Sequence, residues 1–450
     1  MTIIHAAQAL TSRGWRSNVR LTVEAGRIAA VEVDIAPMTG DERHAVIVPA
    51  MANLHSHAFQ RGMAGLAELR GPSADDFWSW RDVMYRFALS MNPEQVEAIA
   101  SQVYVEMLEA GFCRVGEFHY LHHQVDGQPY QDIGEMAVRI AAAAERTGIG
   151  LTLLPVFYAH STFGGVAPTQ SQKRFTNTVD GYSRLLERCR AAVAGLDRAV
   201  VGVAPHSLRA VTPQELAAVT GMAPGAPIHI HIAEQYKEVE DCVAWSGQRP
   251  VQWLLDHAPV DQRWCLVHAT HVDEAEMARI ATTGAVAGLC PITEANLGDG
   301  IFSAPDFVRL GGRFGIGTDS NIQVGVAAEL RLLEYSQRLL HRTRNVLGNA
   351  DCSTGRVLLE RALQGGAAAL GAPTANMAVG CSADVVSLDA GHPVLACKNG
   401  DALVDAWIFS GGNGVIDCVW VGGEKLVEHG RHVRRDEIRS RFFAAMKQLC

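Results

Sequence analysis

The sequence predicts an α/β fold, a TIM-like (β/α)8 barrel with a small β-sandwich domain that is built from both ends of the chain. Through the middle of the chain, apolar runs alternate with amphipathic helical patterns, which is typical of parallel β-α units. Eight such runs occur, and that number favours a barrel. Both chain ends instead carry short strand patterns with turns. We expect residues 1–46 and 376–450 to form the β-sandwich domain, with a C-terminal helix, and residues 47–375 to form the barrel.

Length and composition narrow the class of protein. The chain has 450 residues, which is enough for a barrel of about 250 residues and a second module. Its formal net charge of −9 gives no reason to expect nucleic acid or an anionic membrane as a partner. The sequence contains no signal-peptide pattern and no apolar run long enough to span a membrane, and its ten cysteines form no C-x-x-C pair. We therefore expect a cytoplasmic protein.

The first 44 residues have the pattern of short strands. Val19, Leu21 and Val23 alternate with polar residues, as in a strand with one buried face. Ala25-Gly26 then predicts a hairpin turn, and the strand pattern resumes over 28–33.

From residue 45 onward the pattern changes to barrel strands and helices. Asn92-Pro93 predicts a helix start, which Gly111 ends, and Thr212-Pro213 predicts another. Further helices are expected around 140–146 and 356–363. The eight predicted strands cover residues 45–54, 112–120, 151–157, 198–205, 227–232, 264–268, 285–290 and 314–319.

After the last helix, the strand pattern of the N-terminal segment returns. Residues 383–388, 404–409 and 416–421 are short apolar segments separated by glycine-rich turns, and we expect each to be a strand. The two ends thus resemble each other, and we interpret them as one small domain into which the barrel is inserted.

The most informative short pattern is His55-Ser56-His57 at the end of the first predicted strand. Residues i and i+2 of a strand point to the same face, so the two imidazoles enter one small volume. Two neutral imidazoles placed in this way are a good start on a zinc or iron site.

Polar residues recur at the ends of most other predicted strands, where the active-site residues of a barrel lie. A single buried histidine is usually structural, but imidazoles or a carboxylate at the ends of six of the eight strands indicate one shared site. The residues are His55 and His57 (first strand), Glu117, His119 and Tyr120 (second), His206 and Arg209 (fourth), His229, His231 and Glu234 (fifth), His268 (sixth) and Asp319 (eighth).

Chemistry suggests a role for most of these residues. Three histidines and an aspartate, His55, His57, His231 and Asp319, form a good ligand set for a divalent metal. Glu234 is a candidate acid/base, because it lies three residues beyond His231. The remaining histidines have weaker assignments: we expect His268 to be catalytic or to support a ligand and His229 to be structural, and His119, His122, His123 and His160 have no assigned role.

These residues resemble the amidohydrolase superfamily over nearly the whole chain. The strand-end histidines and Asp319 match its metal site, and residues 382–389 look like its C-terminal return to the β domain. Binuclear members usually carry a carboxylated lysine at the end of the fourth strand, whereas this chain has Pro205-His206-Ser207 there. The resemblance therefore implies one metal ion per chain, which we expect to be Zn²⁺, although another divalent metal would fit the same ligands.

Within the superfamily the chain most resembles the formimidoylglutamate deiminases. The H-x-x-E pattern of His231 and Glu234 looks like that of deaminases acting on C=N carbons, and four longer stretches, residues 53–62, 78–81, 116–120 and 204–209, carry the closer resemblance. By this resemblance the substrate-binding residues are Gln60, Arg81, Tyr120, His206 and Arg209.

The resemblance implies hydrolysis of N-formimidoyl-L-glutamate to N-formyl-L-glutamate and ammonia, as in histidine degradation. The metal would acidify water, Asp319 and His268 would accept or steer its proton, and Glu234 would pass a proton to the departing nitrogen. The alternative is another amidohydrolase-type deaminase that acts on a purine, a pyrimidine or a nucleoside. We expect a small dicarboxylate as the partner molecule, and a homodimer.

Overall fold

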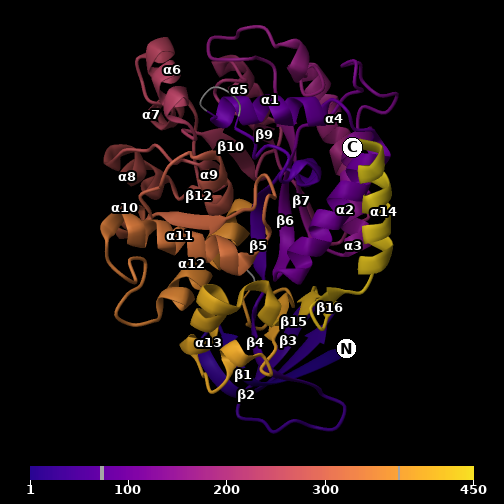
Figure 1. The fold of residues 1–450 in the computed structure, drawn as a ribbon, viewed down its shortest axis with the longest axis vertical. Helices are drawn as coiled ribbons and strands as arrows, with labels where there is room; N and C mark the ends of the chain where they lie inside the picture. The colour runs from indigo at the N-terminus through magenta and orange to yellow at the C-terminus, as the bar shows by residue number, and fades with distance from the viewer. Residues whose placement is uncertain (71–74, 373–375, 450) are drawn as a thin grey trace.

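The structure is a computed structural model that describes residues 1–70, 75–372 and 376–449. In Figure 1 the strands of both chain ends lie together at the bottom, and the parallel strands with their helices form the upper part. The predicted boundary at residue 46 falls within a strand of the end sheet, and the one at 375 lies outside the described residues. The domain limits therefore stay a prediction.

The central strands form two parallel sheets. The first contains β5 (Met51–Ser56), β6 (Phe112–His119), β7 (Gly150–Phe157) and β8 (Ala199–Val201), with β9 (Ala204–Pro205) paired to β7; the second contains β10 (Ile228–Ile232), β11 (Trp264–His268), β12 (Val286–Leu289) and β13 (Arg313–Ile316). Isolated parallel bridges join the two sheets at both seams, one between Ser56 and Asp319 and another between Val203 and Ile228. The predicted parallel strands are thus present, arranged as two bridged sheets and not as one closed ladder.

Helices alternate with these strands, as the sequence pattern predicts. Asn92 and Thr212 each form a capping box at the start of a helix, which confirms the two predicted starts. The helices of this region are α1 (Phe77–Ala88), α2 (Pro93–Glu109), α3 (Glu135–Thr147), α4 (Val179–Val193), α5 (Pro213–Gly221), α6 (Tyr236–Ser246), α7 (Pro250–His257), α8 (Glu274–Thr283), α9 (Pro291–Leu297), α10 (Ala304–Arg309), α11 (Val326–His341) and α12 (Thr354–Ala369), with short 3-10 turns η1 (Ala58–Met63) and η2 (Gln170–Gln172).

The two chain ends share one eight-stranded sheet. Its order is β17-β16-β15-β14-β4-β1-β2-β3, with β1 at Thr2–Thr11, β2 at Gly14–Glu24, β3 at Arg27–Glu32, β4 at Glu42–Pro49, β14 at Val385–Leu388, β15 at Ile416–Val421, β16 at Glu424–Glu428 and β17 at Arg431–His432. The predicted sandwich is therefore a single sheet, although one of its faces buries a separate core that includes Leu21, Ile47 and Trp420. The last helix, α14 (Arg435–Leu449), packs beside α2, and Arg441 pairs there with Glu97 at 2.9 Å.

Two of the eight expected strands are each divided in the structure. Residues 45–54 form two strands, because β4 ends at Pro49 in the end sheet and β5 begins at Met51 in the barrel region. The apolar run gives no sign of this break, since both strands are buried around it. The fourth strand is likewise interrupted between β8 and β9.

The prediction of a strand at 404–409 is wrong. This segment is α13 (Asp401–Ala406) followed by a π-helical turn at Trp407–Gly411. Val404, Trp407 and Ile408 are all buried, at the i, i+3, i+4 spacing of one helical face. A short apolar run is compatible with either a buried strand or a buried helix, so the sequence pattern alone could not separate them.

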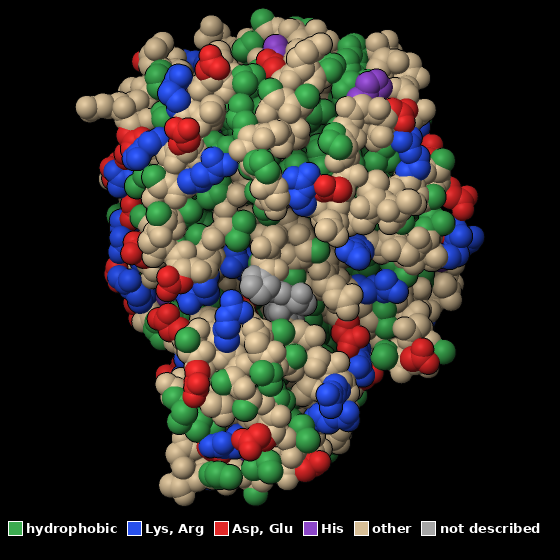
Figure 2. Space-filling view, turned by 180° about the vertical axis from the view of Figure 1, so that it is seen from behind, with side chains coloured by type: hydrophobic (Ala, Val, Ile, Leu, Met, Phe, Trp, Pro, Cys, Tyr) green, Lys and Arg blue, Asp and Glu red, His purple; other side chains and the backbone are tan. Residues whose placement is uncertain are grey.

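The surface carries charges of both signs. On the face shown in Figure 2, basic and acidic side chains are interspersed over the described residues, which agrees with the modest negative net charge. Among the described residues, no helix combines the length and the hydropathy needed to cross a bilayer.

Candidate active site

Four predicted metal ligands lie together in the structure, although they come from the ends of three strands that are far apart in the sequence. His55 is in β5, His57 follows it directly, His231 is in β10, and Asp319 lies three residues after β13. Their ligand atoms all lie within 4.8 Å of one another. The Nε2 atom of His55 is 3.2 Å from Nε2 of His57 and 2.9 Å from Nε2 of His231, and Oδ1 of Asp319 is 3.1 Å from Nε2 of His57.

This cluster fits a single divalent metal ion. Burial lowers the pKa of His55 to about 3, so its imidazole is neutral and its Nε2 atom can act as a ligand. His57 donates from Nδ1 to the carbonyl of Phe118 at 2.9 Å, which leaves Nε2 of His57 as the bare nitrogen. Tetrahedral ligands about 2.0–2.1 Å from zinc lie about 3.3 Å apart, close to the separations found here.

The Asp319 carboxylate supplies the negative charge of this set. Burial by itself would raise its pKa, but the adjacent imidazoles of His55 and His57 hold the pKa of Asp319 well below its usual range. Asp319 has a φ of +45°, and Asn321 secures this strained turn by donating to the carbonyls of His57 and Asp319 at 3.1 and 3.0 Å. The chain segments that follow β5 and β13 are therefore fixed to each other.

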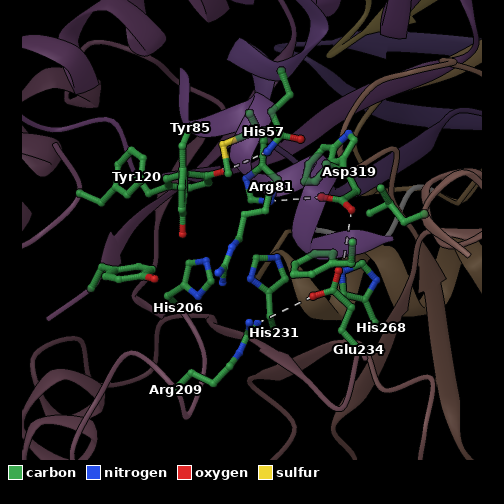
Figure 3. Close-up of a pocket in the computed structure, with 17 residues that line it drawn as sticks. His57, Arg81, Tyr85, Tyr120, His206, Arg209, His231, Glu234, His268 and Asp319 are labelled. Carbon is green, nitrogen blue, oxygen red and sulfur yellow. Dashed lines mark hydrogen bonds and ion pairs between the residues drawn. The ribbon is translucent and has the colours of Figure 1, made fainter. Parts of the chain in front are cut away.

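Glu234 and His268 lie beside the four candidate metal ligands. Ala233, with a φ of +50°, turns the chain after β10, so that Glu234 faces the cavity that contains the cluster (Figure 3). Oε1 of Glu234 lies 3.8 Å from Nε2 of His268, and Oδ2 of Asp319 lies at the same distance from that nitrogen. On its other side, His268 donates from Nδ1 to Oε1 of Glu294 at 3.3 Å.

The charges of this pair are set by burial and by each other. Burial raises the pKa of Glu234 to about 7, although His268 and Arg209 act in the opposite direction. Burial would lower the pKa of His268, but Glu234 and the hydrogen bond to Glu294 raise that pKa to about 10. A carboxyl group with a pKa near neutrality can both accept and release a proton under physiological conditions.

One cavity connects these groups with the predicted substrate-binding residues. Arg81, on α1, lies with its Cζ atom 4.5 Å from the ring centre of Trp78 and 5.4 Å from that of Tyr85. Its Nε atom is buried without a hydrogen-bond partner among the described residues. The described lining consists of His57, Gln60, Phe77, Trp80, Arg81, Met84, Tyr85, Tyr120, Tyr158, Phe175, His206, Arg209, His231, Glu234, His268, Leu297 and Asp319.

Arg209 approaches the cavity from the side of Glu234. Its NH2 atom lies 3.9 Å from Oε2 of Glu234 and 3.9 Å from Oε2 of Glu238. In Figure 3 the guanidinium groups of Arg81 and Arg209 both point toward the space beside His206 and His231. The cavity thus joins two arginines to three of the four candidate metal ligands and to the Glu234–His268 pair.

The cavity also has neutral polar groups, which lie near His57 and near His231. Gln60 donates from Nε2 to the hydroxyl of Tyr120 at 2.9 Å, and its Oε1 atom is buried without a partner among the described residues. The ring of His206 lies 4.9 Å from that of His231, and burial holds the pKa of His206 well below its usual range. These groups are suited to hydrogen bonding with a polar ligand.

The structure also shows the surroundings of His229, which the sequence predicts to be structural, and of the four histidines that had no assigned role. His229 donates from Nε2 to the carbonyl of Ala369 at 2.7 Å, as expected for a structural histidine. His122 and His123 likewise contact backbone carbonyls, and His160 pairs with Glu215 at 2.9 Å. His119, with its pKa lowered to about 3 by burial, has an Nε2 atom without a partner among the described residues.

Sequence reasoning missed two buried glutamates around the site, Glu238 and Glu294, and it gave no role to a third, Glu117, which it had placed at the end of the second strand. Oε1 of Glu117 accepts from the N–H of Ala58, the residue after His57, at 2.8 Å. Glu294 contacts His268, and Glu238 faces Arg209. The four-residue spacing of Glu234 and Glu238 could have indicated that the two glutamates lie near each other, but nothing in the sequence indicated that Glu294 meets His268.

Comparisons with known proteins match the chain to the amidohydrolase family. The profile of the amidohydrolase family matches residues 46–426, and a profile described as "Formimidoylglutamate deiminase HutF, N-terminal domain" matches residues 1–45. A formimidoylglutamate deiminase of Pseudomonas aeruginosa is 50% identical over the full length of both chains. A 5-methylthioadenosine/S-adenosylhomocysteine deaminase of Natronomonas pharaonis is 27% identical over 91% of this chain and 88% of its own.

Solved structures of other proteins share the fold of this chain. The crystal structure of an amidohydrolase from Brucella melitensis superposes with a TM-score of 0.97 at 58% identity and covers 100% of both chains. An adenosine deaminase from Xanthomonas campestris with bound zinc has a TM-score of 0.82 at 22% identity, over 100% of this chain and 98% of its own, which shows a shared fold alone.

Proposed function

The chain belongs to the amidohydrolase family, and on that premise we propose that it is a metal-dependent deiminase that hydrolyses N-formimidoyl-L-glutamate. The products are N-formyl-L-glutamate and ammonia. This is the activity named for the relative that is 50% identical over its full length, and histidine degradation is the pathway to which we assign it.

One observation carries the assignment of substrate. Arg81, on α1, and Arg209, in the segment between β9 and α5, line the same cavity as three of the four candidate metal ligands. Formimidoylglutamate has two carboxylates and a formimidoyl group that can bear positive charge. A guanidinium group binds a carboxylate through two parallel hydrogen bonds, so two arginines match the two carboxylates. Glu234 is the anionic group available to the formimidoyl end.

His55, His57, His231 and Asp319 are proposed to hold one Zn²⁺ ion per chain. When bound, this metal would act as a Lewis acid and would lower the pKa of the hydrolytic water toward neutrality. The donor set supports a single ion. Binuclear sites of this superfamily usually contain a bridging carboxylated lysine, and no lysine is present among the described residues that line the cavity.

The protein groups then move protons and hold the substrate. Water supplies oxygen to the formimidoyl carbon, and both of its protons go to the nitrogen that leaves as ammonia. Glu234, with a pKa of about 7, accepts a proton and passes it to that nitrogen. His268 carries positive charge between Glu234 and Asp319, and Glu294 keeps its ring oriented. Gln60, Tyr120 and His206 contact the substrate between the two ends.

The test is ammonia release from a panel of substrates. The purified protein should act on formimidoylglutamate far better than on guanine, cytosine or 5-methylthioadenosine. These three represent the competing assignment, which the named activity of the 27% identical relative makes worth testing. Good turnover of a nucleobase or nucleoside with none of formimidoylglutamate would refute the proposed substrate.

We further propose that the protein works in the cytoplasm as a homodimer. The nine described cysteines are all free, which fits a reducing compartment. Light scattering of the purified protein would test the homodimer.

A further inference from the structure

Glu238 is a buried carboxylate that the proposed reaction does not use. It lies in the first turn of α6, and its side chain is 0% exposed. Its Oε1 atom accepts from the N–H of Ala233 at 3.3 Å, and its Oε2 atom accepts from the N–H of Glu234 at 3.2 Å. The same Oε2 atom lies 3.9 Å from NH2 of Arg209. Two backbone donors and one guanidinium group therefore converge on this carboxylate.

The first consequence concerns the direction of the Glu234 side chain. The backbone before Glu234 is in the left-handed region at Ala233, with a φ of +50°, which a residue with a side chain adopts at a cost. The hydrogen bonds to Glu238 hold the N–H groups on both sides of that strained position. Glu238 thus fixes the turn that aims Glu234 into the cavity.

The second consequence concerns Arg209. Its NH2 atom is equally far, 3.9 Å, from Glu234 and from Glu238, which is longer than a charge-assisted hydrogen bond of about 2.7–2.9 Å. Its Nε atom is buried without a partner among the described residues. The guanidinium group is therefore held between two carboxylates and keeps donors for a ligand. Without the charge of Glu238, Arg209 would be drawn onto Glu234, and that contact would occupy both the acid/base and the cation.

We propose that Glu238 is a positioning residue, which aligns the acid/base Glu234 with the carboxylate-binding Arg209. The proposal rests on the function proposed above, since it assigns Arg209 to a substrate carboxylate. It predicts that loss of Glu238 weakens carboxylate binding through Arg209 and slows proton transfer through Glu234, while the metal ligands keep their geometry.

The test is Glu238→Gln, which keeps the size of the side chain, removes its charge and replaces one of the two accepting oxygens by an NH2 group that cannot accept a hydrogen bond. We expect kcat/KM for formimidoylglutamate to fall about 10- to 100-fold, with a higher KM and a lower kcat, at unchanged metal content. Binding of glutarate, a dicarboxylate without the reacting group, should weaken about tenfold in calorimetry. In an Arg209→Gln background, Glu238→Gln should weaken glutarate binding little further, because the two groups act as a unit.

The chain offers a matched control in Glu334. Its side chain is also 0% exposed, accepts from the N–H groups of Val346 and Leu347 at 2.9 and 3.0 Å, and pairs with Nε of Arg338 at 2.7 Å. It is not among the residues that line the cavity. Glu334→Gln should lower the melting temperature, as loss of a buried carboxylate does, but should leave kcat, KM and glutarate affinity unchanged.

A folded Glu238→Gln variant with wild-type kinetics would overturn the proposal, and so would equal effects on glutarate binding with and without Arg209. If Glu238→Gln does not fold, Glu238→Asp is judged by the same criteria, since it keeps the charge but withdraws it by one methylene. If the wild type releases no ammonia from formimidoylglutamate and yet binds glutarate in a Glu238-dependent manner, the proposed function fails and the role of Glu238 stands.

Discussion

Replacement of Glu234 by glutamine is the most direct test of the proton transfers. Glutamine has the same size and no titratable group, so the cavity and the metal cluster should keep their shape. General acid/base groups contribute roughly 10²–10⁴-fold to rate, and we expect kcat to fall by about 10³. KM should change less, because Arg81 and Arg209 remain to bind the two carboxylates.

The pH dependence adds a second, independent signature. Burial raises the pKa of Glu234 to about 7. The reaction needs the ionised form first, because Glu234 must accept a proton before it can donate one. In the wild type, kcat/KM should therefore rise with pH up to about 7 and fall about tenfold for each unit below it. In Glu234→Gln this acidic limb should disappear, since no carboxylate titrates at that position.

The assay is ammonia release measured from about pH 5 to about pH 9, with metal content determined on the same samples. Glu240→Gln, at an exposed position of α6, the helix that follows Glu234, is the control and should behave as the wild type. Full turnover by Glu234→Gln, or an acidic limb that survives the substitution, would refute the assignment of Glu234 as the acid/base.

Three further predictions concern other groups of the site. Elemental analysis should find one divalent ion per active chain, and His231→Ala should lose both metal and activity; two ions per chain would contradict the mononuclear site. Arg81→Lys and Arg209→Lys should each lower kcat/KM about 10- to 100-fold at normal metal content, because lysine cannot form the paired hydrogen bonds; unchanged kinetics would remove them from the substrate site. Glu294→Gln should lower kcat roughly five- to tenfold with little change in KM, because the bond that orients His268 becomes a weaker neutral one; a KM effect alone would contradict that role.

Much of the fold could be predicted because local patterns report on buried faces. The capped starts at Asn92 and Thr212 follow from side chains that satisfy their own backbone N–H groups, which is a local property. The hairpin at Ala25-Gly26 is similar, since both residues have positive φ there. The error at 404–409 arose where a short apolar run was compatible with either periodicity and only its packing partners decided between them.

The break at Ala50 shows a different limit. Residues on both sides of it are apolar and buried, so composition cannot show that the chain leaves one sheet and enters another. That change is visible only in the hydrogen bonds, where β4 pairs with β1 and β14 whereas β5 pairs with β6.

For the site, the sequence by itself determined which residues are the candidates, because parallel strands must direct their carboxyl ends to one side and His55, His57, His231, His268 and Asp319 all fall at such ends. Only the tertiary structure decided how the surrounding charges are distributed. The pairing of Glu294 with His268 and the placement of Arg209 midway between Glu234 and Glu238 depend on contacts between separate elements. The physical reason is that interactions between charges depend on distance and burial, neither of which is recorded in the order of the residues.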